Sequence, residues 1–230
     1  MSVKPILFNT DMVRAILDGR KTVTRRVAKP QPMIGSTIYT NIDVAGRVCA
    51  EIWGNGAVKY IKQPYHRGDI LWVRETWAQR SRGNYLYRAA PHGFGTPGQQ
   101  DETMRGLGLK WHPSIHMPRE AARIWLRVTD VRVERLQDIS EEDAKKEGIK
   151  PRHFDGCSAC GAGYPHYPEC DYEHCGNYQN FYGDWRWIVP FAELWDSTIN
   201  LKDFKKYGWG ANPWVWVIAF ERGEMPEGEK

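Results

Sequence analysis

The sequence predicts a mixed α+β fold, built as a small β-barrel with short flanking helices and long loop insertions. Three observations lead to this prediction. Several segments are rich in β-branched and aromatic residues, as strands are. The helical patterns are short and do not alternate regularly with strands, which argues against a Rossmann-type sheet. Two segments, 81–120 and 151–186, contain few aliphatic residues and are predicted to be inserted loops in a single domain spanning 1–230.

The elements follow from local patterns along the chain. A helix is expected to end before Gly19, which can take the left-handed conformation after a helix. The alternation of one long strand slips at Thr129–Asp130, which predicts a bulge or a bend. Pro190 is expected in the first turn of the last helix. In chain order we expect a helix over 10–18, strands over 22–27, 70–77, 85–88 and 123–136, helices over 140–148 and 190–198, and a strand over 214–220. Residues 28–50 read as a loop followed by a weak strand.

The composition excludes several classes of protein. Hydrophobic residues make up 41% and charged residues 26% of the 230, so a core can form and wholesale disorder is excluded. The longest apolar run, 215–220, is far shorter than the roughly 20 residues of a membrane-spanning helix. The N-terminus lacks the apolar stretch of a secretory signal. The sequence therefore predicts a cytoplasmic protein that does not enter a membrane.

Charge and aromatic residues point to a local binding site. The net charge is only +4, well below that of a DNA-coating protein. Residues 1–30, however, contain seven Lys or Arg and only two Asp. Eleven Trp and eleven Tyr suit either a packed β core or the stacking of flat ligands. We therefore expect a basic site near the N-terminus rather than a generally cationic surface.

Four of the five cysteines lie close together within 151–186, and the fifth is the distant Cys49. Their spacing, C-x2-C followed by C-x4-C, can close a tetrahedral site of four thiolates. We predict that this loop binds a structural Zn²⁺, which would supply its folding energy. Reduced thiols in a mobile loop and a disulfide are the alternatives, and His166 and His174 are reserve ligands. The predicted ligands are Cys157, Cys160, Cys170 and Cys175.

Three segments together resemble the ASCH domain family, small PUA-like β-barrels tied to RNA and modified nucleosides. They are ILDGRKTVTRR at 16–26, RGDILWVRE at 67–75 and VERLQDISEEDAKKEGI at 133–149. The closing strand, NPWVWVIAF at 212–220, resembles the larger, phage- and prophage-associated branch of the family. The resemblance covers the predicted barrel segments and leaves 81–120 and 151–186 unexplained.

One branch of the family, bacterial N4-acetylcytidine amidohydrolase, implies a catalytic set. Its lysine and threonine match Lys21 and Thr24 in GRKTVTRR, and its glutamate matches Glu147, with Glu141 and Glu142 close by. A threonine hydroxyl needs an adjacent base to attack an amide, and Lys21 could be that base if its charged form is disfavoured. Positions 21 and 24 converge only if Lys21 still belongs to the turn after the helix.

The basic residues around this set are the predicted ligand-binding residues: Arg20, Arg25, Arg26 and Arg74. The predicted partner is RNA or a modified nucleoside. Three activities stay open: hydrolysis of an N4-acylcytidine, binding of RNA or a modified base without catalysis, and ribonuclease activity. The residues alone also fit a solvated basic strand, and the tryptophans of 214–220 fit core positions as well as a stacking platform.

Overall fold

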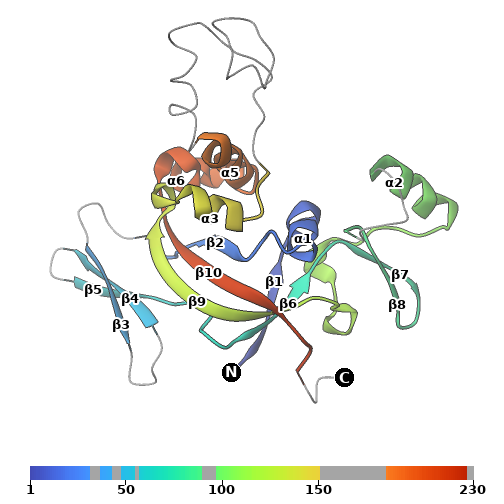
Figure 1. Cartoon of the computed structure of the whole chain (residues 1–230), viewed down its shortest axis with the longest axis horizontal. Coiled ribbons are helices and arrows are strands. Elements are labelled where there is room, and N and C mark those ends of the chain that lie inside the picture. Colours follow the sequence, from blue (N-terminus) through green and yellow to red (C-terminus); the bar gives the residue numbers. More distant parts are fainter. Residues whose placement is uncertain (32–36, 43–47, 55–56, 90–96, 151–184, 227–230) are drawn as a thin grey trace, which may run out of the picture. The chain divides into compact units, whose positions relative to one another are not determined.

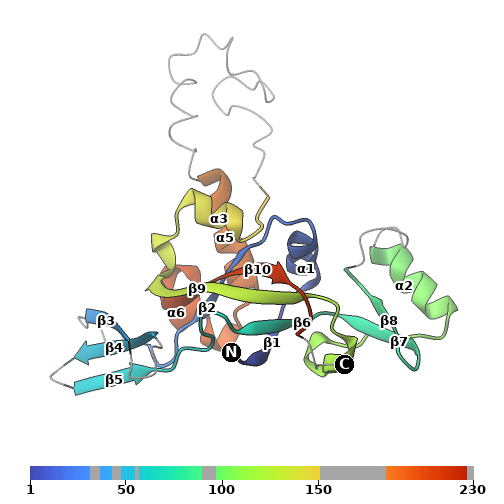
Figure 2. The same cartoon turned by 60° about the horizontal axis from the view of Figure 1, so that its bottom comes forward.

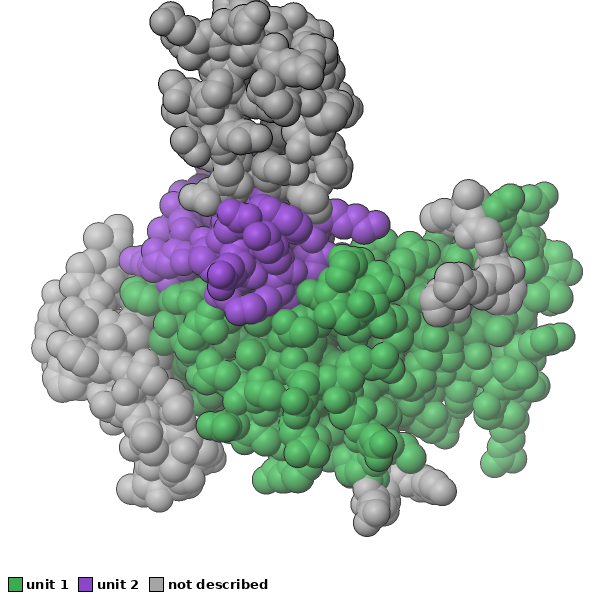
Figure 3. Space-filling view, viewed as in Figure 1, with its two compact units in different colours: residues 1–134, 214–230 green, residues 135–213 purple. Residues whose placement is uncertain are grey.

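The computed structural model describes residues 1–31, 37–42, 48–54, 57–89, 97–150 and 185–226. The predicted single domain is divided into two compact units, coloured separately in Figure 3. Unit 1 comprises 1–134 and 214–230, and unit 2 comprises 135–213. Each is described by itself below.

Unit 1 is built on a five-stranded mixed sheet. Its strands, in spatial order, are β1 (Val3–Leu7), β6 (Ile70–Arg74), β9 (Trp125–Arg135), β10 (Trp214–Gly223) and β2 (Val23–Val27). β1 runs parallel to β6, whereas β6 with β9 and β10 with β2 are antiparallel. Figure 1 shows β9 and β10 as long, curved strands. The mixed α+β class is thereby confirmed. Within the described part of the chain, the sheet is open between β1 and β2, and no closed barrel is found.

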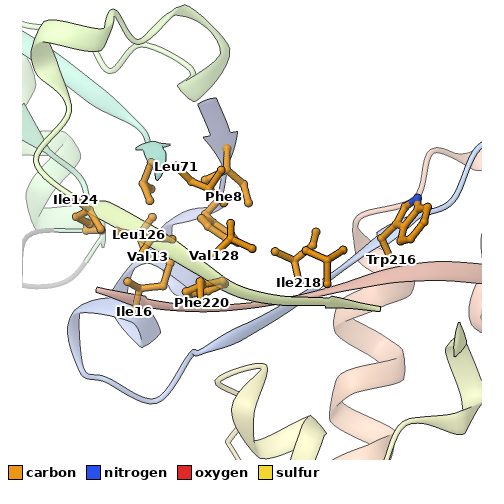
Figure 4. Close-up of a cluster of buried hydrophobic side chains, with 14 of the residues drawn as sticks. Phe8, Val13, Ile16, Leu71, Ile124, Leu126, Val128, Trp216, Ile218 and Phe220 are labelled. Atoms are coloured by element: carbon orange, nitrogen blue, oxygen red, sulfur yellow. The ribbon is translucent and has the colours of Figure 1, made fainter. Parts of the chain in front are cut away.

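One face of this sheet forms the main core together with helix α1 (Thr10–Leu17). Asn9 caps the helix by accepting a hydrogen bond from the backbone N–H of Met12 at 2.8 Å. Figure 4 shows side chains of the helix and of β6, β9 and β10 gathered in this cluster. Val13, Leu126 and Ile218 are all fully buried there. Burial of this apolar face is what holds α1 against the sheet.

The slip predicted in the long strand is confirmed. Val128 and Val131 both belong to the core cluster, although residues three apart on a regular strand point to opposite faces. The backbone of β9 therefore departs from strict alternation between these two residues, which lets both halves of an eleven-residue strand contribute to one core.

Unit 1 also contains elements that the sequence analysis missed. Residues 28–50 and 81–120 were predicted as loops with weak strands, but they contribute to a three-stranded sheet and to a helix. Figure 2 shows the antiparallel hairpin of β7 and β8. β8 (Asn84–Tyr87) is the strand expected over 85–88. The other elements of this part of the chain are β3 (Thr37–Ile42), β4 (Val48–Gly54), β5 (Ala57–Ile61), β7 (Trp77–Ser81), α2 (Pro97–Gly106), η1 (Ser114–His116) and η2 (Arg119–Ala121).

The described part of unit 2 is helical. It contains η3 (Leu136–Asp138), α3 (Glu141–Lys146), α5 (Trp185–Ser197), η5 (Leu201–Asp203), α6 (Phe204–Tyr207) and η6 (Trp209–Ala211). The helix expected over 140–148 is confirmed as α3, and Ser140 caps it, because its Oγ accepts a hydrogen bond from the backbone N–H of Asp143 at 3.1 Å. The predicted start of α5 was wrong: Pro190 lies inside the helix, which begins five residues earlier. An aromatic run precedes the proline, and a proline near a helix start removes few hydrogen bonds. No helix in the described ranges is long and apolar enough to cross a membrane.

Candidate functional site at the start of β2

The turn after α1 places Lys21 outside the strand. Gly19 has a φ of 73°, the left-handed conformation that ends a helix. The backbone N–H groups of Arg20 and Lys21 both donate to the carbonyl oxygen of Ala15, at 2.9 and 3.0 Å. β2 begins only at Val23, and Lys21 makes an isolated β-bridge before it, so Lys21 lies where the helix-ending turn passes into the strand.

The side chain of Lys21 is buried. It is 2% exposed, and its Nζ donates to the carbonyl oxygen of Val23 at 2.9 Å. The same nitrogen lies 5.6 Å from the centroid of the Phe8 ring, within the range of a cation–π contact. Lysine is almost never fully buried without a partner, because its ammonium group loses hydration. The burial of Lys21 therefore marks this position as unusual.

Thr24 and Arg26 lie on the core face of β2. Thr24 is opposite Ile218 and Arg26 is opposite Trp216, and both of these β10 residues belong to the main core. Thr24 is 2% exposed. The Arg26 guanidinium lies 5.3 Å from the Phe8 ring centroid and donates to the carbonyl oxygen of Leu7 at 2.7 Å. The Phe8 ring therefore lies close to two basic side chains, Lys21 from the turn and Arg26 from β2.

Tyr65 adds a phenol to this part of unit 1. Its hydroxyl group donates to the carbonyl oxygen of Pro5 at 3.0 Å, and its ring packs against the main core. Burial raises the pKa of Tyr65, and the positive charge of Arg26 partly opposes that rise. The phenol therefore stays protonated at neutral pH and can donate a hydrogen bond.

Arg25 lies on the opposite face of the strand. Its side chain is 3% exposed, and its Nη2 is 2.6 Å from Oε1 of Glu134. Arg132 Nε donates to the other carboxylate oxygen of Glu134 at 3.1 Å. Successive residues of a strand point to opposite faces, so Arg25 cannot share a site with Thr24 on the core face. The structure thus places Arg25 in an ion pair with Glu134, and its role in ligand binding stays a prediction.

The other two predicted ligand-binding arginines have separate environments. Arg20 Nη2 pairs with Oδ2 of Asp18 at 2.9 Å at the surface. Arg74 lies on β6, where its guanidinium is 5.4 Å from the Trp72 ring centroid and donates to the carbonyl oxygen of Ile115. Of the four arginines, Arg26 shares the face of Thr24 and the aromatic ring beside Lys21.

Glu147 belongs to unit 2. It is the residue that ends α3, and its backbone N–H donates to the carbonyl oxygen of Asp143 at 2.9 Å. It is 4% exposed, whereas Glu142 is exposed and Glu141 pairs with Lys145 at 2.6 Å. Burial thus distinguishes Glu147 from the two neighbouring glutamates. The joint set of Lys21, Thr24 and Glu147 stays a prediction.

Sequence reasoning missed Phe8 and Tyr65 as parts of this site. Phe8 follows β1, a short strand that was not predicted, and Tyr65 lies in the segment leading to β6. The apolar run that ends at Phe8, directly before the helix cap, could have indicated a strand here, but its composition does not differ from that of an ordinary core segment. Only strand pairing brings these rings to the start of β2.

The predicted zinc loop lies outside the described residues. This applies to Cys157, Cys160, Cys170 and Cys175 and to the reserve ligands His166 and His174. In the ranges that the structure does describe, no group of three or more His, Cys, Asp or Glu side chains could hold a metal ion. The Zn²⁺ site therefore stays a prediction from cysteine spacing.

Comparisons with protein-family models, with curated protein sequences and with solved structures give no match for this chain.

Proposed function

We propose that unit 1 binds RNA or a modified nucleoside at the start of β2 and that the site hydrolyses the amide of an N4-acylcytidine. The single observation that carries the proposal is the burial of a lysine and a hydroxyl side chain three residues apart, Lys21 and Thr24, each 2% exposed. Evolution seldom places a lysine in a core for stability alone, because its desolvation is unfavourable. The resemblance of GRKTVTRR to the ASCH signature supplies the substrate class.

The proposal includes a PUA-like fold for unit 1. It is supported by a mixed sheet in which long, curved β9 and β10 sit between shorter strands (Figure 1). It is supported as well by the position of the GRKT segment, directly between a short helix and the edge strand β2. Since one fold can serve many activities, the reaction is argued from the side chains and not from the fold.

The proposed reaction begins with attack of the Thr24 hydroxyl on the acyl carbon of the substrate amide. Lys21, as the neutral amine, accepts the hydroxyl proton as the C–O bond forms. The tetrahedral intermediate then expels the N4 amine of cytidine, which takes back from Lys21 the proton that Lys21 accepted from Thr24, as the C–N bond breaks. Water hydrolyses the resulting threonyl ester, releasing the carboxylic acid and restoring the hydroxyl group.

One further residue of unit 1 has a supporting role in this proposal, whereas Glu147 keeps only the role that the resemblance implies. Arg26, on the face of Thr24, stabilises the developing oxyanion or a phosphate of the substrate. Phe8 lies beside the Lys21 amine and the Arg26 guanidinium and provides an apolar surface that excludes water from both groups.

The test is release of acetate from N4-acetylcytidine by the purified full chain. Lys21→Met keeps the apolar stem without the amine, and Thr24→Val keeps the shape without the hydroxyl. Each is expected to lower kcat at least about 100-fold, the usual size of a lost acid–base or nucleophilic group. The matched controls are Lys62→Met and Thr22→Val, at exposed positions, which should leave turnover unchanged. Circular dichroism and thermal melting establish that each variant is folded.

Full turnover in a folded Lys21→Met protein would exclude the catalytic assignment. If the wild-type protein binds the nucleoside but releases no acetate, binding without catalysis is the better description. The grouping of Arg26, Tyr65 and Phe8 favours that second candidate, because cations and aromatic rings recognise a base without breaking a bond. Cleavage of labelled single-stranded RNA in EDTA would instead indicate a ribonuclease.

A further inference from the structure

The face of the five-stranded sheet that points away from the main core has an unusual composition at β1, β6 and β9. The pairing registers align Pro5, Trp72 and Trp125 in one row, with Leu7 and Arg74 in the next row and Val3, Ile70 and Arg127 in the preceding one. Directly opposed residues share a face. We call these eight residues the outer face. Their neighbours Leu71 and Leu126 are in the core, which fixes the assignment of faces.

The apolar groups of the outer face differ in exposure. Leu7 is 39% exposed and Pro5 is exposed, while Trp72 is half-buried. Trp125 and Ile70 are buried. Pro5 and the exposed part of Trp72 thus form a flat surface on which planar groups can stack.

Arginines are held against both tryptophans. The Arg74 guanidinium lies 5.4 Å from the Trp72 ring centroid, and the Arg119 guanidinium, from η2, lies 5.8 Å from that of Trp125. Arg127 is exposed on the same face. A guanidinium beside an aromatic ring loses little freedom when it binds, and it can contact a phosphate or stack on a base.

Negative charge is absent from these strand positions, since none of the eight outer-face residues is acidic. The acidic residues next to these positions in sequence have partners. Asp69 pairs with Lys4, Glu75 is bound by Arg123, and Glu120 accepts a hydrogen bond from the Tyr85 hydroxyl at 2.7 Å. Arg74, Arg119 and Arg127 together outweigh the charge of Glu120, which makes the surface complementary to a polyanion.

We infer that the outer face binds single-stranded nucleic acid. Its bases stack on Trp72 and on the Arg74 guanidinium, and its phosphates contact Arg119 and Arg127. A polyanion with flat, unpaired bases matches both the aromatic and the cationic features, whereas an acidic peptide matches only the charge. The surface is distinct from the Lys21 site, because Thr24 and Arg26 lie on the core face of the sheet.

The test is fluorescence anisotropy with a labelled twelve-nucleotide oligouridylate and the full-length protein. Arg119→Glu and Arg127→Glu are each expected to weaken binding about tenfold near 0.1 M salt and to reduce its salt dependence. Trp72→Leu should weaken binding roughly tenfold through lost stacking, whereas Trp72→Phe should retain most of the affinity. Arg105→Glu, at an exposed position on α2, is the matched charge control and should have little effect.

The two proposals give separable outcomes. Outer-face variants should hydrolyse N4-acetylcytidine as the wild type does, so loss of oligonucleotide binding with normal turnover supports the outer face alone. Unchanged oligonucleotide affinity in Arg119→Glu and Arg127→Glu, or an equal loss in Arg105→Glu, would overturn the inference. Equally tight binding of polyglutamate would do the same and would point to an acidic protein, and a preference for duplex RNA would exclude stacking on unpaired bases.

Discussion

Glu75 and Arg123 form a bidentate ion pair at the point where β6 ends and β9 is about to begin. Nε of Arg123 is 2.8 Å from Oε1 of the carboxylate, and Nη2 is 2.9 Å from Oε2. Glu75 is 1% exposed, and the Arg123 guanidinium lies 4.1 Å from the Tyr87 ring centroid. The pair thus joins two sheet strands to the hairpin strand β8 within unit 1.

We predict that Arg123→Lys destabilises the protein by about 3 kcal/mol, because an ammonium group cannot make two parallel bonds and leaves a buried carboxylate poorly paired. Urea denaturation followed by tryptophan fluorescence gives the free energy of unfolding. Arg127→Lys, at an exposed position of β9, is the control and should change it little. Equal stability of the Arg123→Lys and wild-type proteins would show that the pair is not structural.

Arg25 is expected to affect folding more than ligand binding. Its pair with Glu134 is buried, so Arg25→Met leaves a carboxylate with fewer partners and should cost about 3 kcal/mol. The double variant Arg25→Met/Glu134→Met should be more stable than the sum of the two single effects predicts. A double-mutant cycle by denaturant unfolding measures this coupling, and strictly additive effects would contradict it.

Because of Asp69, the free energy of unfolding of unit 1 is expected to vary with pH in the acid range. Burial by itself raises the pKa of Asp69, but hydrogen bonds from Lys4, Ser2 and the backbone of His66 outweigh it and lower the pKa to about 2. A carboxylate with a lowered pKa in the folded state stabilises it above the ordinary value of 3.8. This stabilisation is lost as the pH falls from about 4 to about 2.

We therefore predict that Asp69→Asn lowers the free energy of unfolding by about 2 kcal/mol at pH 7. The difference from the wild type should shrink as the pH approaches 2, because the wild-type carboxyl group is then protonated as well. Denaturation at a series of pH values measures the difference. Asp138→Asn, at an exposed position, is the control, and a difference that does not vary with pH would contradict the prediction.

Gly208 has a steric role in unit 2. A Cβ atom at this position would lie 2.8 Å from the backbone carbonyl oxygen of Phe204, whereas one at Gly210 would meet nothing within 4 Å. Gly208→Ala should therefore destabilise the turn after α6 by about 1 to 3 kcal/mol. Gly210→Ala should leave the melting temperature nearly unchanged. A similar melting temperature for the two variants would show that the backbone relaxes without cost.

Local patterns were enough to predict the elements whose structure depends on near neighbours. The helix before Gly19, the cap at Ser140 and the slip in β9 each arise from spacing within one segment. β1 was missed because it is short, contains a proline and exists by pairing with β6, more than sixty residues away. Local sequence carries no signal for such a partner.

The candidate site shows the same division. Turn chemistry and residue spacing are local, so they were enough to predict a basic, hydroxyl-bearing segment after a helix-ending glycine. The burial of Lys21 and Thr24 could not be predicted in this way. The same holds for the pair of Arg25 with Glu134 and for the position of Arg74 beside Trp72. Those outcomes depend on which strands pair and in which register, since the register decides the face on which each side chain lies.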